Sequence, residues 1–269
     1  IENEILDLQN IANIQEDLDE KRLLENLDFV ISEYRKIDPN DAILMQHCLD
    51  IIISGQRLDL VRFGALGSEL TSLKNDSELD DYAYRVAGSV GEFWTAITLQ
   101  NELSGDVSDT ELFDELGIRF GKALQMTNIL RDIPADLALG RCYIPSDRLE
   151  EIGLNHHDLK NLDSIESFRP LYDYYLDLTC EHYSAAIEYI RMIPRKYRRL
   201  RMACLLPVVI GLETIGLLRT GNVLNSAERI KVERSRIKKI ALFCMIATRF
   251  RIFENRILKK ATYRSRNGI

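Results

Sequence analysis

Apolar residues recur at intervals of three and four along most of the chain, as in the stretch from Leu23 to Tyr34. This spacing places them on one face of a helix, and stretches of the strict alternation typical of strands do not occur. The pattern therefore predicts an all-α fold. Turn signals near 38–40, 64–67, 104–105, 145–146, 193–194 and 220–222 separate helices of about 20 to 30 residues. Helices of that length pack best roughly antiparallel around a shared centre.

The composition is that of a globular chain, with 14 Gly and 6 Pro among 269 residues and no linker-like segment. It excludes collagenous and disordered classes and predicts a single domain over residues 1–269. Five scattered cysteines without CxxC spacing indicate a reducing, cytoplasmic location and argue against a structural zinc site. The chain opens on the acidic helical pattern IENEILDL without a capping residue. We therefore expect this domain to lack its N-terminal helix.

Charge is distributed unevenly. The net charge is −7, but residues 230–269 hold 12 Lys/Arg against two Glu. The overall charge gives no reason to expect nucleic-acid binding. The basic end predicts one long helix from about Val232 to Lys260, with an apolar face and a cationic face. The cationic face is expected either to contact anionic lipid at the inner face of the membrane or to dock on the acidic body, and both can hold.

The most informative stretch is QMTNILRDIPADLALGRCYIP, residues 125–145. Asp132 and Asp136 are four apart, so a helix places both carboxylates on one face, where they repel unless a cation is bound. Mg²⁺ suits such a pair because it typically takes one or two protein carboxylates and completes its shell with water and phosphate. A solvated surface helix is the alternative. Pro134 predicts a local distortion of the helix.

Further polar residues surround this pair of aspartates. Arg131 and Arg141 flank it, and guanidinium groups hold diphosphate oxygens in bidentate fashion. Gln125 and Asn128 extend the same polar face. Acids, amides and arginines gathered on an otherwise apolar helix predict a diphosphate site.

This stretch resembles the second aspartate-rich motif of the squalene/phytoene synthase family, the head-to-head prenyl synthases. The segment DYAYRVAGSVGEFW, residues 81–94, is similar to the tyrosine-containing segment of that family, with Ala83 where Cys is usual. A third segment, LRMACLLPVVIGLETIGLLRTGNVL at 200–224, resembles bacterial squalene-synthase-like members. The resemblance covers nearly all of the chain. It implies a class I isoprenoid synthase fold, in which helices surround a central apolar cavity.

The resemblance also implies roles for single residues. Tyr82 matches the family tyrosine that assists proton removal. A phenol with an ordinary pKa of about 10 is a poor base, so we expect Tyr82 to act with the released diphosphate or to orient the carbocation. Tyr143 matches the motif tyrosine and is expected to bind substrate together with Gln125, Asn128, Arg131 and Arg141.

The first aspartate-rich motif of the family falls on residues 3–7, NEILD, by its spacing from the second. Asp7 matches the motif and Asn3 departs from it. An amide oxygen at Asn3 can ligate Mg²⁺ but brings no charge. Asp7, Asp132 and Asp136 are therefore the expected metal ligands.

The function implied by the resemblance is condensation of two farnesyl diphosphates, through a cyclopropyl diphosphate intermediate, to squalene, with Mg²⁺ and NADPH as cofactors. The segment RIKVERSR at 229–236 resembles a basic flap associated with NADPH. Three alternatives remain: a phytoene or dehydrosqualene synthase that uses no NADPH, a non-catalytic relative of the assembly-factor type, and a farnesyl diphosphate phosphatase.

Some residues near these motifs have simpler expected roles. Ala87, Gly88 and Gly91 lack bulky side chains, which lets another helix or a long ligand approach closely. The pair Asp80-Asp81 is expected to begin the helix that carries Tyr82. Asp59 is expected to be structural.

Overall fold

The computed structural model describes residues 11–64 and 69–268. They fall into two compact units, 1–47 and 48–269. The helices are α2 (Leu18–Glu25), α3 (Leu27–Tyr34), α4 (Pro39–Phe63), α5 (Asp76–Ala83), α6 (Ser89–Asn101), α7 (Thr110–Arg131), α8 (Ile133–Ala138), α9 (Ser146–Glu151), α10 (Ile165–Met192), α11 (Arg198–Thr220), α12 (Arg234–Ala247) and α13 (Arg251–Asn267), with the π-helix η1 (Tyr84–Gly88) and the 3₁₀ turns η2 (Asp158–Lys160) and η3 (Leu162–Ser164). The predicted all-α class is confirmed.

The first unit consists of short helices that lead into α4. The side chain of Asp17 accepts hydrogen bonds from the backbone N–H groups of Asp19 and Glu20, at 2.9 and 3.0 Å, and so starts α2. Pro39 is the first residue of α4, where the missing N–H of proline has no intrahelical partner to lose. The predicted turn at 38–40 therefore marks a real helix start.

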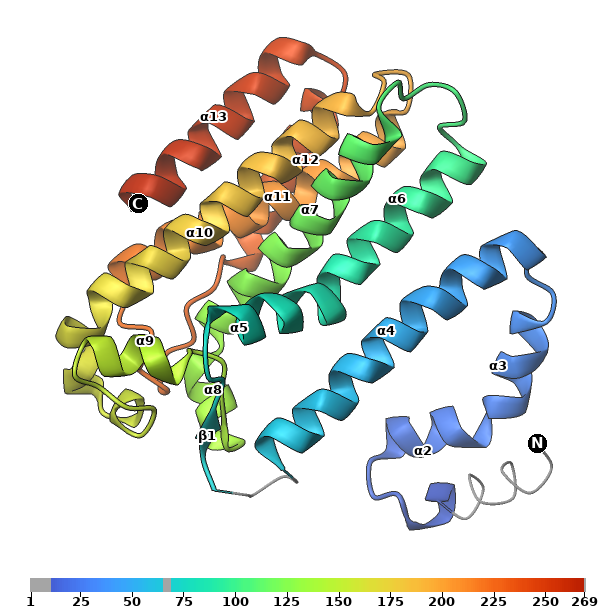
Figure 1. Cartoon of the computed structure of the whole chain (residues 1–269). Coiled ribbons are helices and arrows are strands. Elements are labelled where there is room, and N and C mark those ends of the chain that lie inside the picture. Colours follow the sequence, from blue (N-terminus) through green and yellow to red (C-terminus); the bar gives the residue numbers. More distant parts are fainter. Residues whose placement is uncertain (1–10, 65–68, 269) are drawn as a thin grey trace. The chain divides into compact units, whose positions relative to one another are not determined.

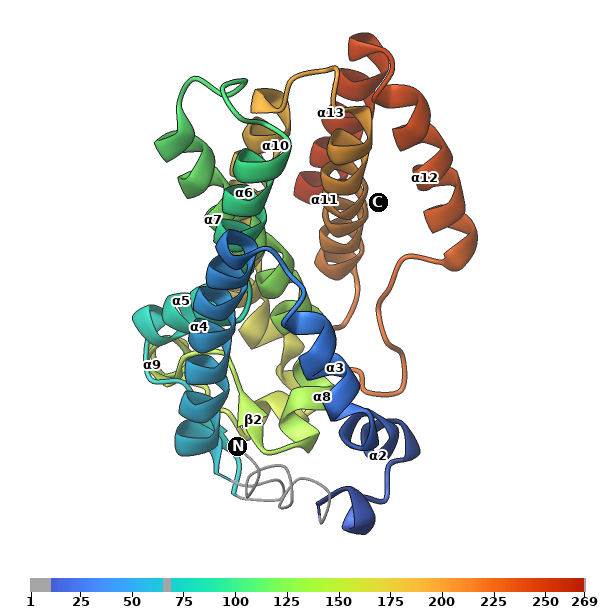
Figure 2. The same cartoon turned by 90° about the vertical axis from the view of Figure 1, so that its right-hand side faces the viewer.

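The core of the second unit lies where α7, α10 and α11 run side by side, as two perpendicular views show (Figures 1 and 2). Helix α10 carries the fully buried Tyr172, Tyr183 and Tyr189, and each phenol has a partner on a neighbouring helix. They contact the Leu130 carbonyl at 3.0 Å, Thr127 Oγ1 at 2.8 Å and Thr95 Oγ1 at 3.1 Å, respectively. Buried hydroxyls need such partners, and these bonds fix α10 against α6 and α7.

Two short strands join distant segments of this unit. β1 (Thr71–Ser72) pairs in parallel with β2 (Arg141–Cys142), with Thr71 opposite Arg141. The Leu73 N–H donates to the Cys142 carbonyl at 3.0 Å. The sequence pattern did not predict these strands. Their pairing holds the segment before α5 beside the residues that follow Asp136.

The basic end differs from the predicted single helix, and that prediction was wrong. The chain forms a hairpin, α12 and α13, joined by a turn at 248–250. The Thr248 hydroxyl donates back to the Met245 carbonyl at 3.0 Å, and Phe250 is extended at φ −131°. This break lets both apolar faces pack against the bundle. One of the two expected roles for this end, docking on the body of the protein, is seen in the ion pair from Arg264 to the buried Glu213 at 3.0 Å.

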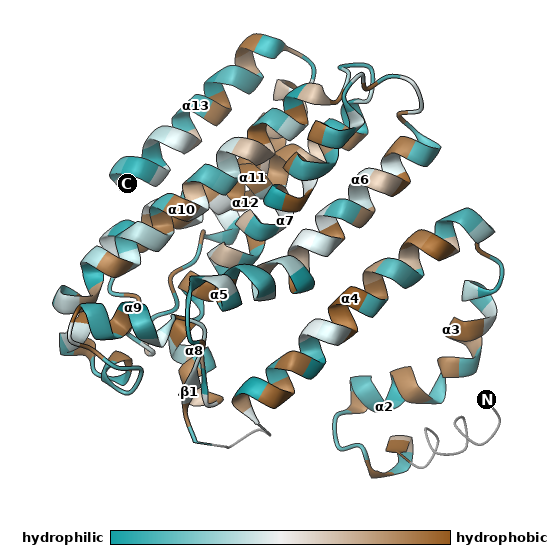
Figure 3. Ribbon diagram, viewed as in Figure 1, coloured by the Kyte–Doolittle hydropathy of each residue, from teal (hydrophilic) through white to brown (hydrophobic). Residues whose placement is uncertain are grey.

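Helix α11 is apolar over most of its length. Among the described residues it is the one helix long and apolar enough to span a bilayer, and 61% of its apolar window is buried inside the protein. Buried core helices commonly have this composition. Figure 3 shows the contrast with α13, which is coloured hydrophilic over most of its length.

Candidate active site

The two aspartates of the 125–145 stretch stand where one helix ends and another begins. Asp132 terminates α7 and precedes α8, and Pro134 occupies the first turn of α8. The Asp136 N–H donates to the Asp132 carbonyl at 3.0 Å. The distortion predicted at Pro134 is therefore confirmed, and it places Asp132 in a helix junction.

Two arginines hold the Asp132 carboxylate. Arg131 Nε donates to it at 3.0 Å and Arg229 Nη2 at 2.7 Å. Burial alone would raise the pKa of Asp132, but these two cations outweigh it and lower the pKa below its usual value. Arg229 lies 97 residues further along the chain, in the loop between α11 and α12. Sequence reasoning noted the basic segment at 229–236 but not this contact.

Asp136 has a different environment. No ion pair to it is found within the described residues, and burial, followed by the nearby Asp132, raises the pKa of Asp136 to about 7. Arg141 and Arg131 lower it less, while Asp59 raises it further. We call Asp59, Asp132 and Asp136 the carboxylate cluster. Of its three members, Asp132 has two arginines within 3.0 Å, Asp59 has Arg141 at 4.0 Å, and Asp136 has no ion pair with a described residue.

Asp59 connects this cluster to two tyrosines. The Tyr82 hydroxyl donates to the Tyr143 hydroxyl at 3.1 Å, and the Tyr143 hydroxyl donates to Asp59 Oδ2 at 2.9 Å. The two rings stack with centroids 4.4 Å apart. Asp59 is 7% exposed, and its Oδ1 is buried without a hydrogen-bond partner. Burial raises the pKa of Asp59 despite the bond from Tyr143. The expectation of a merely structural Asp59 missed this link, because α4 is distant in sequence.

The helix that carries Tyr82 also begins elsewhere than expected. The Asn75 side chain accepts from the Glu78 N–H at 3.0 Å and starts α5 at Asp76. Asp80 and Asp81 therefore lie inside the helix, and the prediction that they begin it was wrong. Asp81 accepts from Arg85 Nε at 2.9 Å, and Asp80 pairs with Lys122 at 2.7 Å.

Directly after α5, the backbone widens into the π-helix η1, which the sequence pattern did not predict. Arg85 within it donates to the Ser54 hydroxyl of α4 at 2.8 Å. A Cβ added at Gly55 would lie 2.9 Å from the Arg85 Cβ. The glycine therefore lets α4 approach η1 closely enough to bring Asp59 to Tyr143.

An apolar cavity of about 410 Å³ lies beside the second half of α7. Gln125 and Asn128 line it, as do Trp94, Phe120 and Leu124, whereas Tyr82 and the carboxylate cluster do not. Asn128 and Asp132 are four apart, about 6 Å by helical rise. The cavity and the carboxylate cluster therefore follow each other along one face of α7.

Glycines form one wall of this cavity. A Cβ at Gly91 would lie 2.0 Å from the Gly117 carbonyl oxygen, and one at Gly121 would lie 2.0 Å from the Ala87 carbonyl oxygen. Both glycines line the cavity and also let the backbones of α6, η1 and α7 touch. Close helix packing, one of the two roles expected for the small residues at 87–91, is confirmed. The other, approach of a long ligand, stays a prediction for which the cavity leaves space.

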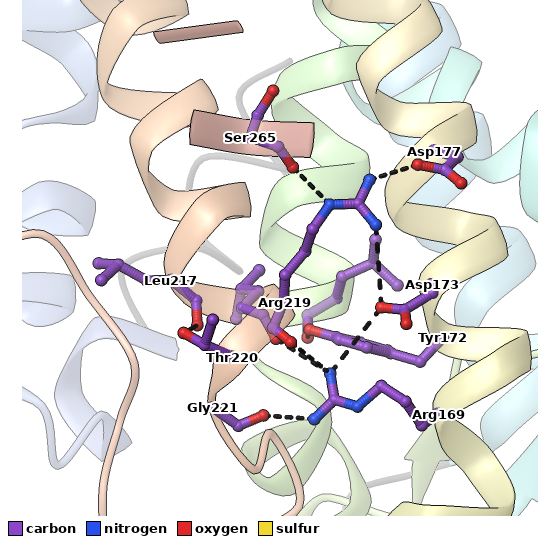
Figure 4. Close-up of polar contacts among 11 residues, drawn as sticks. Arg169, Tyr172, Asp173, Asp177, Leu217, Arg219, Thr220, Gly221 and Ser265 are labelled. Carbon is purple, nitrogen blue, oxygen red and sulfur yellow. Dashed lines mark hydrogen bonds and ion pairs between the residues drawn. The ribbon is translucent and has the colours of Figure 1, made fainter. Parts of the chain in front are cut away.

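A polar network fixes the end of α11, from which the Arg229 loop departs (Figure 4). Arg169 of α10 donates to the Leu218 carbonyl at 3.1 Å and the Gly221 carbonyl at 2.5 Å. Arg219 contacts Asp177 and the Ser265 carbonyl. These bonds tie α10, α11 and α13 together. The loop therefore starts from a fixed point before it crosses to Asp132.

The model of one protein family, described as squalene/phytoene synthase, matches residues 5–236. The chain belongs to this family. Matches to individual squalene/phytoene synthases cover less of the chain than this family model does. It is 32% identical over 151 residues to the 15-cis-phytoene synthase of Synechocystis sp., covering 55% of this chain and 42% of that protein. It is 31% identical over 122 residues to the presqualene diphosphate synthase of Rhodopseudomonas palustris, covering 45% and 41%. The matches thus span about half the length of such relatives or less.

Solved structures agree with the fold of a squalene/phytoene synthase. A ligand complex of TcSQS superposes with a TM-score of 0.71 at 16% identity, covering 98% of this chain and 82% of that one. A dehydrosqualene synthase in complex with a ligand gives a TM-score of 0.61 at 20% identity, covering 91% and 85%. At these identities the likeness shows the fold alone.

The site residues predicted for this family member fall into two groups. Gln125 and Asn128 line the cavity. The others gather at the carboxylate cluster: Tyr82, Arg131, Asp132, Asp136, Arg141 and Tyr143. Arg141 Nη1 lies 4.0 Å from Asp59 Oδ2. Asn3 and Asp7 lie outside the described residues.

Proposed function

We propose that this squalene/phytoene synthase family member joins two prenyl diphosphates head to head through a cyclopropyl diphosphate intermediate. One observation carries the proposal: along one face of α7, an apolar cavity that ends at Asn128 is followed one turn later by a cluster of buried and half-buried carboxylates flanked by arginines. A substrate with an apolar chain and an anionic head would fit this arrangement, with its chain in the cavity and its head at the carboxylates and arginines. The cavity volume of about 410 Å³ lies near the lower end of ligand-pocket volumes, which favours a short prenyl chain over a longer one. Farnesyl diphosphate is therefore the proposed substrate.

The carboxylate cluster fits Mg²⁺. Its donors are carboxylate oxygens, which that ion prefers. Asp59 Oδ1 is buried without a hydrogen-bond partner, and Asp136 makes no ion pair with a described residue, so each could accept a further cation. Within the described residues no three His, Cys, Asp or Glu side chains already converge as a metal site. When bound, Mg²⁺ would neutralise the diphosphate and favour its departure. Asp132 and Asp136 are the proposed ligands, and Asp7 stays a prediction.

The arginines have a second role in this proposal. Arg131 and Arg229 neutralise Asp132 in the absence of substrate. Their guanidinium groups match diphosphate oxygens equally well, so they can transfer from the carboxylate to the departing anion. Arg229 suits this exchange because its side chain is 60% exposed and lies in a loop.

Tyr82 does not act as a free base in this scheme. Burial, reinforced by the charges of Asp59 and Asp136, raises the pKa of Tyr82 to about 12. The phenol therefore stays protonated at neutral pH and donates to Tyr143. Its oxygen lone pairs remain available to orient a carbocation, and proton removal falls to the released diphosphate. The apolar cavity walls exclude water from the cation.

For the final product we propose squalene, for which NADPH would supply a hydride; the basic segment 229–236 is the proposed place for that cofactor. Loss of a proton in place of hydride delivery would give a phytoene-type or dehydrosqualene-type product. Both outcomes join two prenyl chains of the same kind by the same head-to-head bond. The presence of an intact Asp132–Asp136 pair with its arginines favours either product over a non-catalytic role.

The test is incubation of the chain, in its full natural length, with radiolabelled farnesyl diphosphate and Mg²⁺, with and without NADPH, followed by product analysis. We expect a cyclopropyl diphosphate without NADPH and squalene with it. Asn3→Asp is a useful companion, because restored turnover in that variant alone would show that the first motif has degenerated. Farnesol as the sole product would favour a phosphatase. No Mg²⁺-dependent consumption of farnesyl diphosphate, by wild type or by Asn3→Asp, would overturn the proposal.

A further inference from the structure

The hairpin formed by α12 and α13 exposes a concentrated apolar surface at its turn. Its members, which we call the hairpin tip, are Leu242, Phe243, Met245, Ile246, Phe250, Ile252 and Phe253, between 41% and 80% exposed. The rings of Phe250 and Phe253 contact each other at 5.9 Å. Single exposed apolar residues are ordinary, but seven large ones within twelve positions form a patch of the kind that marks an interaction site.

The charge around the tip has one sign. Residues 234–267 contain eleven Lys/Arg and one acid, Glu254. Glu254 is buried and held by Arg201 at 2.5 Å, so it contributes no exposed negative charge. Arg236 and Arg264 pair with Glu213. The other nine cations make no ion pair with any described residue: Arg234, Lys238, Lys239, Arg249, Arg251, Arg256, Lys259, Lys260 and Arg266.

The apolar and cationic groups are ordered along the hairpin. The tip residues occupy the last turns of α12 and the first turn of α13, and Lys238, Lys239 and Arg256 lie about one turn behind them. One helical turn is about 5 Å. Interfacial segments bury their apolar side chains about 5–10 Å below the headgroups, with Lys and Arg at phosphate level. The long stems of Arg249 and Arg251 reach the same level from the turn itself.

The tip is also held rigidly and can receive an acyl chain. The ion pair from Arg201 to Glu254 fixes the first turn of α13 on α11. Between α11, α12 and α13 lies a cavity of about 350 Å³, lined by Phe243, Ile246 and Phe253 of the tip and by Arg256 and Lys260. Glu213 and Arg236 also line the cavity and pair with each other, so Arg256 and Lys260 are the cations beside its apolar walls that could meet an anionic headgroup above a lipid chain.

We propose that the hairpin tip docks this protein on an anionic phospholipid bilayer, with the seven apolar side chains among the lipid chains and the surrounding cations at the phosphates. A nucleic acid would not require the apolar tip, and a protein partner would need exposed acids to match nine unpaired cations. A bilayer with anionic lipid satisfies both features at once.

Docking in this orientation would also place the substrate cavity near the lipid. Ala203 and Cys204 line that cavity and follow Arg201, which contacts Glu254 in the first turn of α13. The turn of the hairpin lies at the end of the bundle away from α8 in both views (Figures 1 and 2). This part rests on the proposed function: an apolar product would leave towards the bilayer while diphosphate leaves towards water.

The experiment is sedimentation of the full chain with vesicles, without substrate, so its result does not depend on the proposed reaction. One set of vesicles is pure phosphatidylcholine and the other contains about one third phosphatidylglycerol. We expect binding to the anionic vesicles. Phe250→Gln with Ile252→Gln should weaken it about tenfold or more, through lost apolar burial. Lys238→Gln with Lys239→Gln should weaken it by a similar factor.

Matched controls keep the test falsifiable. Leu112→Gln, 41% exposed at the start of α7, with Lys160→Gln, should bind as wild type does. Circular dichroism checks that every variant folds. Equal binding of the wild type and the Phe250/Ile252 variant to the anionic vesicles would overturn insertion of the tip. That holds even if added salt released both proteins from the vesicles, because binding would then be electrostatic alone. Absence of vesicle binding, with a dimer that the Phe250/Ile252 variant breaks, would assign the tip to a second copy of the chain.

Discussion

The second unit holds three buried acids, Asp59, Glu213 and Glu254, and a half-buried one, Asp136, in two places that differ in how closely arginines pair with them. Glu213 and Glu254 lie under the hairpin, and each meets two arginines: Arg236 and Arg264 in the first case, Arg201 and Arg195 in the second. Asp59 and Asp136 lie at the end of α7, where the pKa of each is raised chiefly by burial. A buried carboxylate is costly unless it is paired. Each acid of the first place has an arginine within 3.0 Å. In the second, Asp59 has its nearest paired cation, Arg141, at 4.0 Å, and Asp136 has no ion pair with a described residue.

This difference points to a structural role for Glu213 and Glu254 and is consistent with the proposed cation-binding role at Asp59 and Asp136. Charges paired within the fold stabilise an arrangement of helices, here that of α11 with α12 and α13. Charges left unpaired store a cost that a bound cation can remove, which is one reason perturbed pKa values gather at functional sites. Three variants test the contrast, each by a change in stability.

The largest effect is expected at the paired acids. Arg201→Met leaves Glu254 buried with Arg195 at 3.8 Å as its remaining cation, and should lower the free energy of unfolding by about 3–5 kcal/mol. Urea denaturation measures it. Adding Glu254→Leu should restore much of the loss, because no buried charge then remains. Lys196→Met, which breaks an exposed pair with Asp106, serves as control and should cost less than about 1 kcal/mol. Equal losses for the two single variants would contradict the comparison.

An effect of opposite sign is expected at Asp136, which has no ion pair with a described residue. The pKa of Asp136 is about 7 in the folded chain against an ordinary 3.8, so the folded state binds its proton more tightly. Stability from this group is full below about pH 4 and is lost as pH rises to 7. Asp136→Asn should therefore stabilise the Mg²⁺-free protein at pH 8 by about 1–3 kcal/mol, after allowance for partial solvent screening.

Thermal unfolding at pH 8 and pH 4.5 measures this gain, which should shrink at the lower pH. The same variant should lose turnover at least about a hundredfold, since a ligand of the proposed ion is removed. A lower melting temperature for Asp136→Asn at pH 8 would show that Asp136 is already compensated. It would then belong with Glu213 and Glu254.

The smallest effect concerns the hydrogen bonds that join Tyr82 and Tyr143 to Asp59. Tyr143→Phe removes the donor at 2.9 Å from Asp59 and the acceptor for Tyr82. The expected cost is about 1 kcal/mol of stability and about a tenfold loss of kcat, with little change in KM. Steady-state kinetics and thermal unfolding measure the two. Tyr263→Phe, at an exposed tyrosine, should leave both unchanged. An unchanged kcat in Tyr143→Phe would remove this chain of hydrogen bonds from the site.

Much of the fold and the local part of the site could be predicted from sequence. Helical periodicity is a local signal, and the turns at 38–40, 145–146 and 220–222 mark helix boundaries in the structure. The residues from Gln125 to Tyr143 lie in one stretch, so their joint role was visible. Asp59 and Arg229 were not placed with them, because their contacts depend on α4 and on the loop after α11.

Two backbone features escaped prediction for a related reason. The π-helix η1 satisfies its own hydrogen bonds and leaves the apolar pattern of residues 84–88 unchanged, so periodicity does not reveal it. The turn at 248–250 contains neither Gly nor Pro. There the apolar faces of α12 and α13, packed on α11, decide where the helix breaks.

If the cavity holds the proposed prenyl chain, its glycines limit how the length of that chain can change. Gly91 and Gly121 point across to the backbone of the neighbouring helix, so larger residues there would separate the helices before they shortened the space. The same cavity is also lined by the large side chains of Trp94, Phe120 and Leu124, which can be trimmed or enlarged. A change in substrate length would therefore be expected to arise by substitution of these large side chains and not of the glycines.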